Sequence, residues 1–165
     1  MSPQPTWLWP TLPDALPWTL AWAGELAAGG PGKPPLLPYN LSDFVPAGVI
    51  SNLGTNDGAG GRFGNATFAA LYVARYAAML ELVAAAAAAA GAPRPQIFVG
   101  VGPMTTSYAA AAAEVVRQLG AKGYPATLLN LTLAAGRCGC GHPSAQDHAE
   151  LAAMVTPIVK AALKW

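Results

Sequence analysis

Short apolar segments alternate with longer, alanine-rich segments along the second part of the chain. Three of the apolar segments have the length of strands and end at glycine or polar residues, as strands buried in a sheet do. They are residues 47–53, 96–101 and 126–131. Three longer segments predict helices, because alanine has the highest helix propensity. They cover about 65–90, 106–119 and 144–162. This alternation favours a parallel sheet with helices on both faces.

Small polar residues mark the predicted helix starts. They are Asn65 or Thr67, then Thr106 or Ser107, and finally Ser144. Ser144 and Asp147 have the spacing of a capping box. On the first helix we expect an apolar face that includes Phe68, Leu71, Val73, Met79, Leu82 and Val83.

Residues 1–46 do not show this alternation of short apolar and longer alanine-rich segments. They contain most of the prolines and four of the five tryptophans, at positions 7, 9, 18 and 22. Residues 16–28 predict one short helix, and the prolines of 31–38 predict an extended linker. The tryptophans either pack onto the domain or line a substrate groove, and packing is favoured. We therefore expect an irregular segment, 1–46, followed by an α/β domain over 47–165.

Composition narrows the classes of partner. The net charge is +1 and only 10% of residues are charged, so nothing indicates binding to nucleic acid or to an anionic membrane. The uncharged run between Glu81 and Pro93 is shorter than the roughly 20 residues that span a bilayer. The N-terminal residues lack the pattern of a secretory signal, and the sequence predicts no particular compartment.

The two cysteines give no metal prediction. Cys138 and Cys140 are separated by a single residue, so a disulfide between them would be strained. A lone Cys-x-Cys without a second pair is also a weak zinc signal. We expect reduced thiols, with no metal and no cofactor.

Candidate chemistry lies in the loops that follow the three strands. The first holds Asn56, whose amide can donate a hydrogen bond to a developing oxyanion. The third holds His142, a candidate general base with an unperturbed pKa near 6.5. Each signal is weak alone, because Asn-Asp-Gly is also an ordinary turn and a lone histidine is more often structural.

Taken in order, three motifs resemble a known family. They are Asn52-Leu-Gly-Thr-Asn-Asp57, then Ile97-Phe98 with Gly102-Pro103-Met104, then Gly141-His-Pro-Ser144 followed by His148. Over about residues 45–162 the chain resembles the SGNH (GDSL-type) hydrolases, and within them the carbohydrate O-acetyl esterases. The resemblance implies a three-layer, flavodoxin-like sheet and hydrolysis of a small-molecule or glycan acetyl ester without a metal.

The resemblance also implies site residues. Asn56 would be the oxyanion donor and His142 the catalytic base. Gly54 would permit a tight turn, and Asp57 would brace the loop. Gly102 and Met104 would belong to the second loop of the site. His148 matches a helix position of the pattern, where a structural role is favoured over a catalytic one.

The departures from the family pattern concern the nucleophile. No Gly-Asp-Ser tripeptide occurs, and no serine has the expected context; the serines are Ser2, Ser42, Ser51, Ser107 and Ser144. The acid that usually precedes the histidine by three residues is replaced by Gly139, which a Ser-His dyad would tolerate. We therefore expect an incomplete sheet, the C-terminal portion of a longer esterase, with an apolar strand edge at 47–53 exposed for pairing.

Two other functions compete with this hypothesis. A pseudo-esterase or glycan-binding module would keep the groove and lack the nucleophile. Nucleotide binding is disfavoured, because the glycines at 58–64 and 100–102 match neither G-x-G-x-x-G nor the P-loop pattern.

Overall fold

The computed structural model describes residues 45–132 and 142–165. The predictions for 1–44 lie outside the described residues. These are the 16–28 helix, the 31–38 linker and the packing of four tryptophans. The predictions for Cys138, Gly139 and Cys140 also lie outside them.

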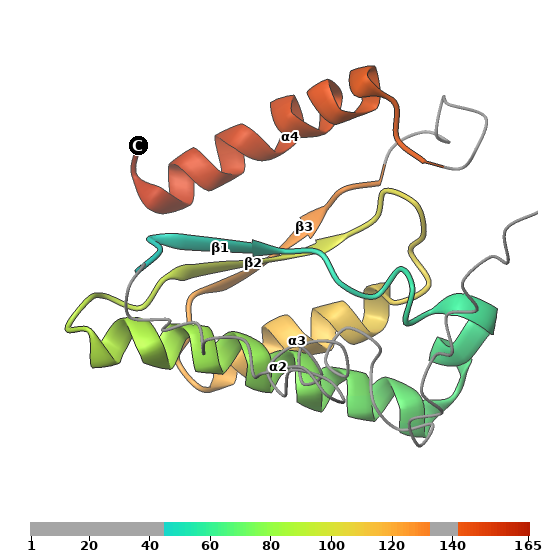
Figure 1. The fold of residues 1–165 in the computed structure, drawn as a ribbon, viewed down its shortest axis with the longest axis horizontal. Coiled ribbons are helices and arrows are strands. Elements are labelled where there is room, and N and C mark those ends of the chain that lie inside the picture. Colours follow the sequence, from blue (N-terminus) through green and yellow to red (C-terminus); the bar gives the residue numbers. More distant parts are fainter. Residues whose placement is uncertain (1–44, 133–141) are drawn as a thin grey trace, which may run out of the picture.

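The described residues form a parallel α/β sandwich (Figure 1). In chain order the elements are β1 (Gly48–Ser51), η1 (Ala59–Gly64), α2 (Ala66–Ala89), β2 (Gln96–Val101), α3 (Ala109–Ala121), β3 (Ala126–Asn130) and α4 (Ala145–Leu163). The sheet has the order β1-β2-β3, with β2 parallel to both neighbours. Helices α2 and α3 cover one face and α4 lies over the other (Figure 1). The predicted three-layer α/β architecture is confirmed.

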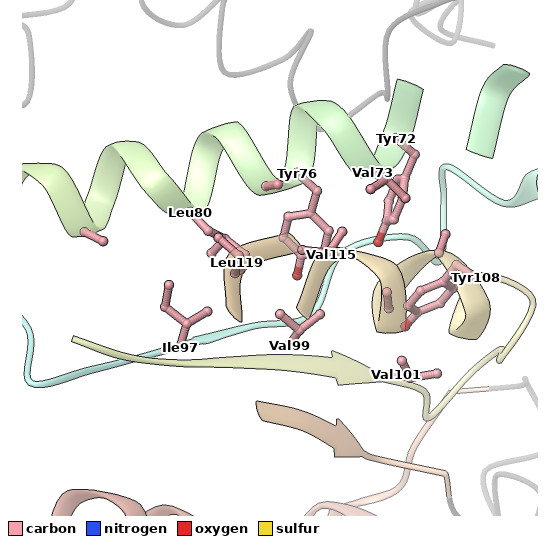
Figure 2. Packing of buried hydrophobic residues seen from close by; sticks show 14 residues of the cluster. Tyr72, Val73, Tyr76, Leu80, Ile97, Val99, Val101, Tyr108, Val115 and Leu119 are labelled. Atoms are coloured by element: carbon pink, nitrogen blue, oxygen red, sulfur yellow. The ribbon is translucent and has the colours of Figure 1, made fainter. Parts of the chain in front are cut away.

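The central strand divides its side chains between the two faces. Ile97, Val99 and Val101 belong to the cluster formed with α2 and α3 (Figure 2). Phe98 is fully buried and alternates with them, as the two-residue period of a strand requires. Because β2 is covered on both faces of the sheet, its sequence is a nearly continuous apolar run.

The buried face of α2 differs from the predicted one. Its buried residues recur about every four positions, as one face of a helix does; they are Phe68, Tyr72, Val73, Tyr76, Ala77, Leu80, Ala84 and Ala87. Leu82, expected in the core, is 63% exposed. The prediction was wrong there because it selected aliphatic residues and passed over tyrosines, whose rings are largely apolar.

Two of the predicted helix caps are present. The Asn65 side chain accepts a hydrogen bond from the Phe68 amide at 3.1 Å. Ser144 and Asp147 form a complete capping box at the start of α4. Each cap satisfies backbone amides that a helix start leaves without intrahelical partners.

Helix α3 begins later than predicted, with Tyr108 in the capping position and without a side-chain cap. The Ser107 amide instead donates to Thr105 Oγ1 at 3.2 Å. This local bond forms a turn that competes with the helix, so the first helical residue is Ala109.

Helix α2 is long and apolar enough to cross a membrane by length and composition alone. The helix is longer than the uncharged run between Glu81 and Pro93 because it also includes the charged residues Arg75 and Glu81. One side of it packs in the domain core (Figure 2), and core helices of this kind pass the same test.

Candidate functional site

The predicted site segments leave the sheet at one edge. All three strands run in the same direction, so their carboxyl ends meet there (Figure 1). The loop from β1 to η1, the loop from β2 to α3 and the start of α4 lie at this end (Figure 1). This is the edge at which open α/β sheets bind ligands.

The first loop has a buried base and an exposed tip. Gly54 is buried with φ of +128°, and a Cβ there would lie 2.6 Å from the Tyr108 ring. Asn56 is exposed, so its amide is accessible to a ligand. Asp57 is only 1% exposed, which places its carboxyl group in the interior beneath the loop. The tight turn expected at Gly54 is therefore present.

The glycine-rich segment after Asp57 forms η1 rather than an open loop. Gly60 and Gly61 have φ of +71° and +74°, with no atom within 4 Å of a Cβ at either position. Phe63 packs edge-on against the Tyr72 ring, with centroids 4.9 Å apart. An aromatic contact of this geometry anchors η1 to α2.

The second loop begins with a glycine in tight contact with the segment that follows β3. Gly102 has φ of +106°, and a Cβ there would lie 2.9 Å from the Leu131 backbone. The Gly102–Pro103 peptide bond is cis. Met104 is 44% exposed beyond this turn. Packing therefore explains Gly102, while Met104 is accessible from solvent.

A hydrogen-bonded group that sequence reasoning missed joins these two loops. Asn52 Nδ2 donates to the Gly102 carbonyl at 2.7 Å. The Tyr108 hydroxyl donates to Asn52 Oδ1 at 2.8 Å and accepts from the Gly102 amide at 3.1 Å. Asn52 opens the quoted motif, but Tyr108 carries no local signal because it only precedes an alanine-rich helix.

Two further tyrosines lie beneath the first loop. The Tyr72 hydroxyl donates to the Leu53 carbonyl at 2.7 Å, and the Tyr76 hydroxyl donates to Ser51 Oγ at 2.8 Å. Burial raises the pKa of Tyr76 to about 12 and, with the nearby Tyr76, Asp57 and Tyr108, raises the pKa of Tyr72 further. Both remain neutral donors at physiological pH.

The third segment places His142 just ahead of α4. His142 is exposed, and Ser144, two residues later, accepts from the Asp147 amide at 3.2 Å. The Asp147 carboxylate in turn accepts a hydrogen bond from the Ser144 amide at 2.7 Å. His148 is exposed on the first turn of α4. The capping box therefore fixes the chain two residues after His142.

The described serines each have a structural position. Ser51 Oγ accepts from Tyr76 in β1, Ser107 lies in the turn before α3 and Ser144 caps α4. Within residues 45–132 and 142–165, no three His, Cys, Asp or Glu side chains are grouped as a metal site would require.

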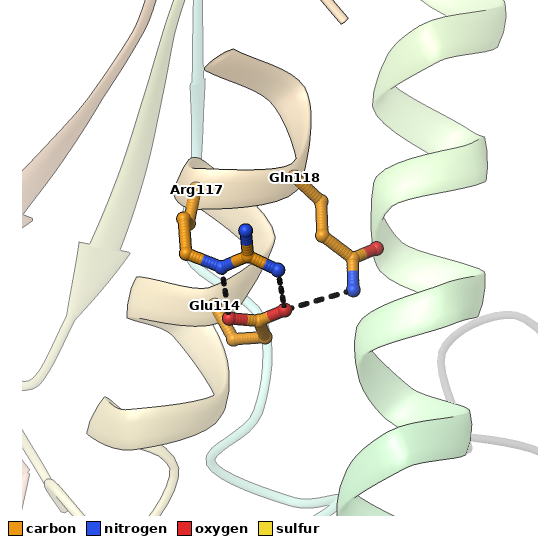
Figure 3. A network of polar contacts seen from close by, with 3 residues as sticks. All are labelled: Glu114, Arg117 and Gln118. Carbon is orange, nitrogen blue, oxygen red and sulfur yellow. Dashed lines mark hydrogen bonds and ion pairs between the residues drawn. The ribbon is translucent and has the colours of Figure 1, made fainter. Parts of the chain in front are cut away.

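A cavity of about 380 Å³ lies between α2 and α3, with Glu114 and Gln118 on its wall. Arg117 donates two hydrogen bonds of 2.6 Å to the Glu114 carboxylate, and Gln118 donates a third at 3.0 Å (Figure 3). The bonds from Arg117, then that from Gln118, lower the pKa of Glu114 to about 2. This exposed network engages the Glu114 and Gln118 side chains of the wall.

Comparison with known proteins supports an esterase-like fold. No protein-family profile and no curated protein sequence matches the chain. Among solved structures the chain is similar to a family two carbohydrate esterase from Clostridium thermocellum, determined in complex with cellohexaose. The identity is 25% and the TM-score 0.65, over 92% of this chain and 43% of that one. The chain thus has a carbohydrate-esterase-like α/β fold and spans less than half of that protein's length.

Proposed function

We propose that this chain contributes to the hydrolysis of acetyl esters on carbohydrates, with His142 as general base and Asn56 as oxyanion donor. One observation carries the proposal. The NLGTND and HPS motifs lie at the same edge of a sheet whose fold is similar to that of a carbohydrate esterase. Both side chains are exposed there, as groups that meet a glycan from solvent must be.

The proposed roles follow from the chemistry of acyl transfer. His142 accepts the proton of the attacking hydroxyl as its oxygen bonds to the acetyl carbon. The carbonyl oxygen then becomes negatively charged, and the Asn56 amide donates a hydrogen bond to it. Return of the proton to the sugar oxygen releases the alcohol, and water hydrolyses the acetyl-enzyme by the same steps.

The nucleophile is a separate part of the proposal. None of the described serines has the expected sequence context, and Ser51 and Ser144 are engaged in the contacts given above. We propose that sequence outside these 165 residues supplies the serine. A transcript that covers the upstream region without a Gly-Asp-Ser motif would contradict this part alone.

The histidine assignment is tested by hydrolysis of 4-nitrophenyl acetate and of an acetylated cello-oligosaccharide, using the longest chain that the transcript encodes. We expect His142→Ala to abolish turnover. His148→Ala is the matched control, because this second exposed histidine lies six residues away, and it should retain activity within about threefold. Equal activity of both variants would reject His142 as the base.

The oxyanion assignment is tested by Asn56→Ala. We expect a loss of roughly 100- to 1,000-fold in turnover, the usual effect of removing one oxyanion donor. The exposure of Asn56 makes a folding defect a poor explanation for such a loss. A decrease of less than about threefold would remove Asn56 from this role.

A glycan-binding protein without catalysis is the second candidate, favoured by the missing nucleophile context. Titration calorimetry with cellohexaose, beside the hydrolysis assay, separates the two. Binding without turnover supports the binding module, whereas turnover that depends on His142 rejects it.

A further inference from the structure

Three residues close a ring of hydrogen bonds at the carboxyl edge of the sheet. Asn52 follows β1, Gly102 follows β2 and Tyr108 precedes α3. We call these three residues the Tyr108 tie. The Gly102 carbonyl bonds directly to Asn52, which follows β1, and the Gly102 amide bonds to the Tyr108 hydroxyl, which in turn donates to Asn52.

The donors and acceptors of the Tyr108 tie are mutually consistent. A phenol hydroxyl has one proton to donate and lone pairs that accept. The Tyr108 hydroxyl donates along its shorter contact, to Asn52 Oδ1 at 2.8 Å, and accepts from the Gly102 amide at 3.1 Å. The Asn52 amide then donates to the Gly102 carbonyl at 2.7 Å. Replacement of the Tyr108 hydroxyl by an apolar group would leave the Gly102 amide without this acceptor.

The residues that follow β3 pack directly against the Tyr108 tie. A Cβ on Gly102 would lie 2.9 Å from the Leu131 carbonyl and 3.0 Å from the Thr132 amide nitrogen. A Cβ on Gly100 would lie 2.7 Å from the Leu131 side chain and 3.1 Å from Asn52 Cβ. The exits of all three strands are therefore in contact at one place.

The ring of Tyr108 also supports the loop that carries Asn56. Gly54 lies so close to this ring that a Cβ would stand 2.6 Å from two of its carbons. Tyr108 is fully buried, so its hydroxyl and its ring act on the two loops from a fixed position.

We propose that Tyr108 is a positioning residue: its hydroxyl holds the ends of β1 and β2 together, and thereby sets the loop of Asn56 against the loop of Met104. The role deepens the proposed esterase function and rests on it. The Tyr108 tie can be tested without any catalytic activity, because the Gly102 amide donates a hydrogen bond to the Tyr108 oxygen and its exchange can be measured.

The test is Tyr108→Phe, which removes the oxygen and keeps the ring. We expect amide hydrogen exchange at Gly102, followed by nuclear magnetic resonance, to become about 3- to 10-fold faster, the equivalent of one neutral hydrogen bond. Asn52→Ala should accelerate the same amide. Tyr124→Phe is the matched control, because this half-buried tyrosine stacks with Arg94 near the opposite end of the sheet, and it should leave Gly102 unchanged. Unchanged exchange at Gly102 in Tyr108→Phe would overturn the proposal whether or not the chain is an esterase.

The catalytic part is read in the assay described for His142. We expect Tyr108→Phe to lower kcat about tenfold or more while KM changes less than threefold, since a small displacement of a reacting group reduces the rate more than binding. Faster exchange with unchanged kcat would overturn the positioning role. Absence of turnover in the unmodified chain would refute the proposed function, and the exchange of Gly102 would still decide whether the tie exists.

Discussion

The two faces of the sheet are packed in different ways. On one face, α2 and α3 bury a continuous cluster that includes Tyr76, Leu80 and Leu119 (Figure 2). On the other, Phe98 of β2 is buried, but Asp147 is the one residue of α4 (Ala145–Leu163) that is buried. Ile50 of β1 is 57% exposed on this second face, and Met154 and Ile158 of α4 are each 45% exposed. Burial of apolar surface stabilises the first face far more than the second.

The two faces also differ in the sequences of their helices. The buried residues of α2 recur with helical period, which gives a wide apolar stripe. Helix α4 instead has Pro157 in its interior, where a proline removes a backbone hydrogen bond and costs about 3 kcal/mol. Its C-terminal turn approaches the sheet at Gly48, with Leu163 3.2 Å from the position of a Cβ. A cavity of about 180 Å³ between Ile50 and α4 shows that this contact is incomplete.

The candidate site spans both regions. The loop of Asn56 rests on tyrosines of the densely packed face: Tyr72, Tyr76 and Tyr108. His142 precedes the sparsely packed α4, whose start is closed by the Ser144–Asp147 capping box. Tertiary packing on the dense face therefore supports the loop of Asn56, whereas a local helix cap follows His142.

The largest effect is expected from truncation on the dense face. Leu80→Ala should lower the free energy of unfolding by about 2–5 kcal/mol, because it leaves a cavity among fully buried side chains. Ile158→Ala on α4 should cost less than about 1 kcal/mol. Urea denaturation followed by circular dichroism measures both, and Leu82→Ala controls for helix propensity within α2. Similar losses for Leu80→Ala and Ile158→Ala would contradict the contrast between the faces.

A second difference concerns alkaline pH, since Tyr72 and Tyr76 belong to the dense face. Their pKa is higher in the folded than in the unfolded chain, where it is near 10. The native state therefore retains protons that the unfolded state releases. The associated stability is complete below pH 10 and is lost as pH rises, up to about 12 for Tyr76 and beyond for Tyr72.

Thermal melts between pH 9 and pH 11 check this expectation. The melting temperature should fall as pH rises. The double variant Tyr72→Phe with Tyr76→Phe should show a shallower fall, because each tyrosine removed eliminates up to one proton that is released on unfolding. Tyr124→Phe, at a half-buried position, serves as control. The same slope in the double variant and the unmodified chain would show that these tyrosines do not titrate with unfolding.

Much of the fold was predictable because local signals agree with the tertiary structure. The segment 96–101 is one such case: an apolar run bounded by Pro95 and Gly102 became β2 with the predicted bounds. Asn65 and Ser144 fulfilled their predicted capping roles, since a cap depends only on neighbouring amides. The buried face of α2 was less predictable, because alanine and tyrosine occur on both buried and exposed sides of a helix.

The candidate site was predictable as a set of loops but not as a set of contacts. Parallel strands place their carboxyl ends together whatever the side chains, so the location followed from the pattern. The Tyr108 tie joins residues separated by 50 and 56 positions, and no local pattern indicates such a pairing. Asp57 illustrates the same limit, since it is 1% exposed and interacts electrostatically with Tyr72, which another element supplies.

The smallest effect, and the sharpest probe of the sparse face, is expected from Ser144→Ala. Removal of the cap should cost about 0.5–2 kcal/mol. Because little tertiary burial supports α4, the loss should appear as local opening, with faster amide exchange in the first turns of α4 and no change in α2 or α3. Asn65→Ala removes the equivalent cap from α2 and is the matched control; the core should hold that helix closed beyond its first turn. Faster exchange throughout the domain in Ser144→Ala would mean that α4 unfolds together with the core, and the two faces would then be one cooperative unit despite their different packing.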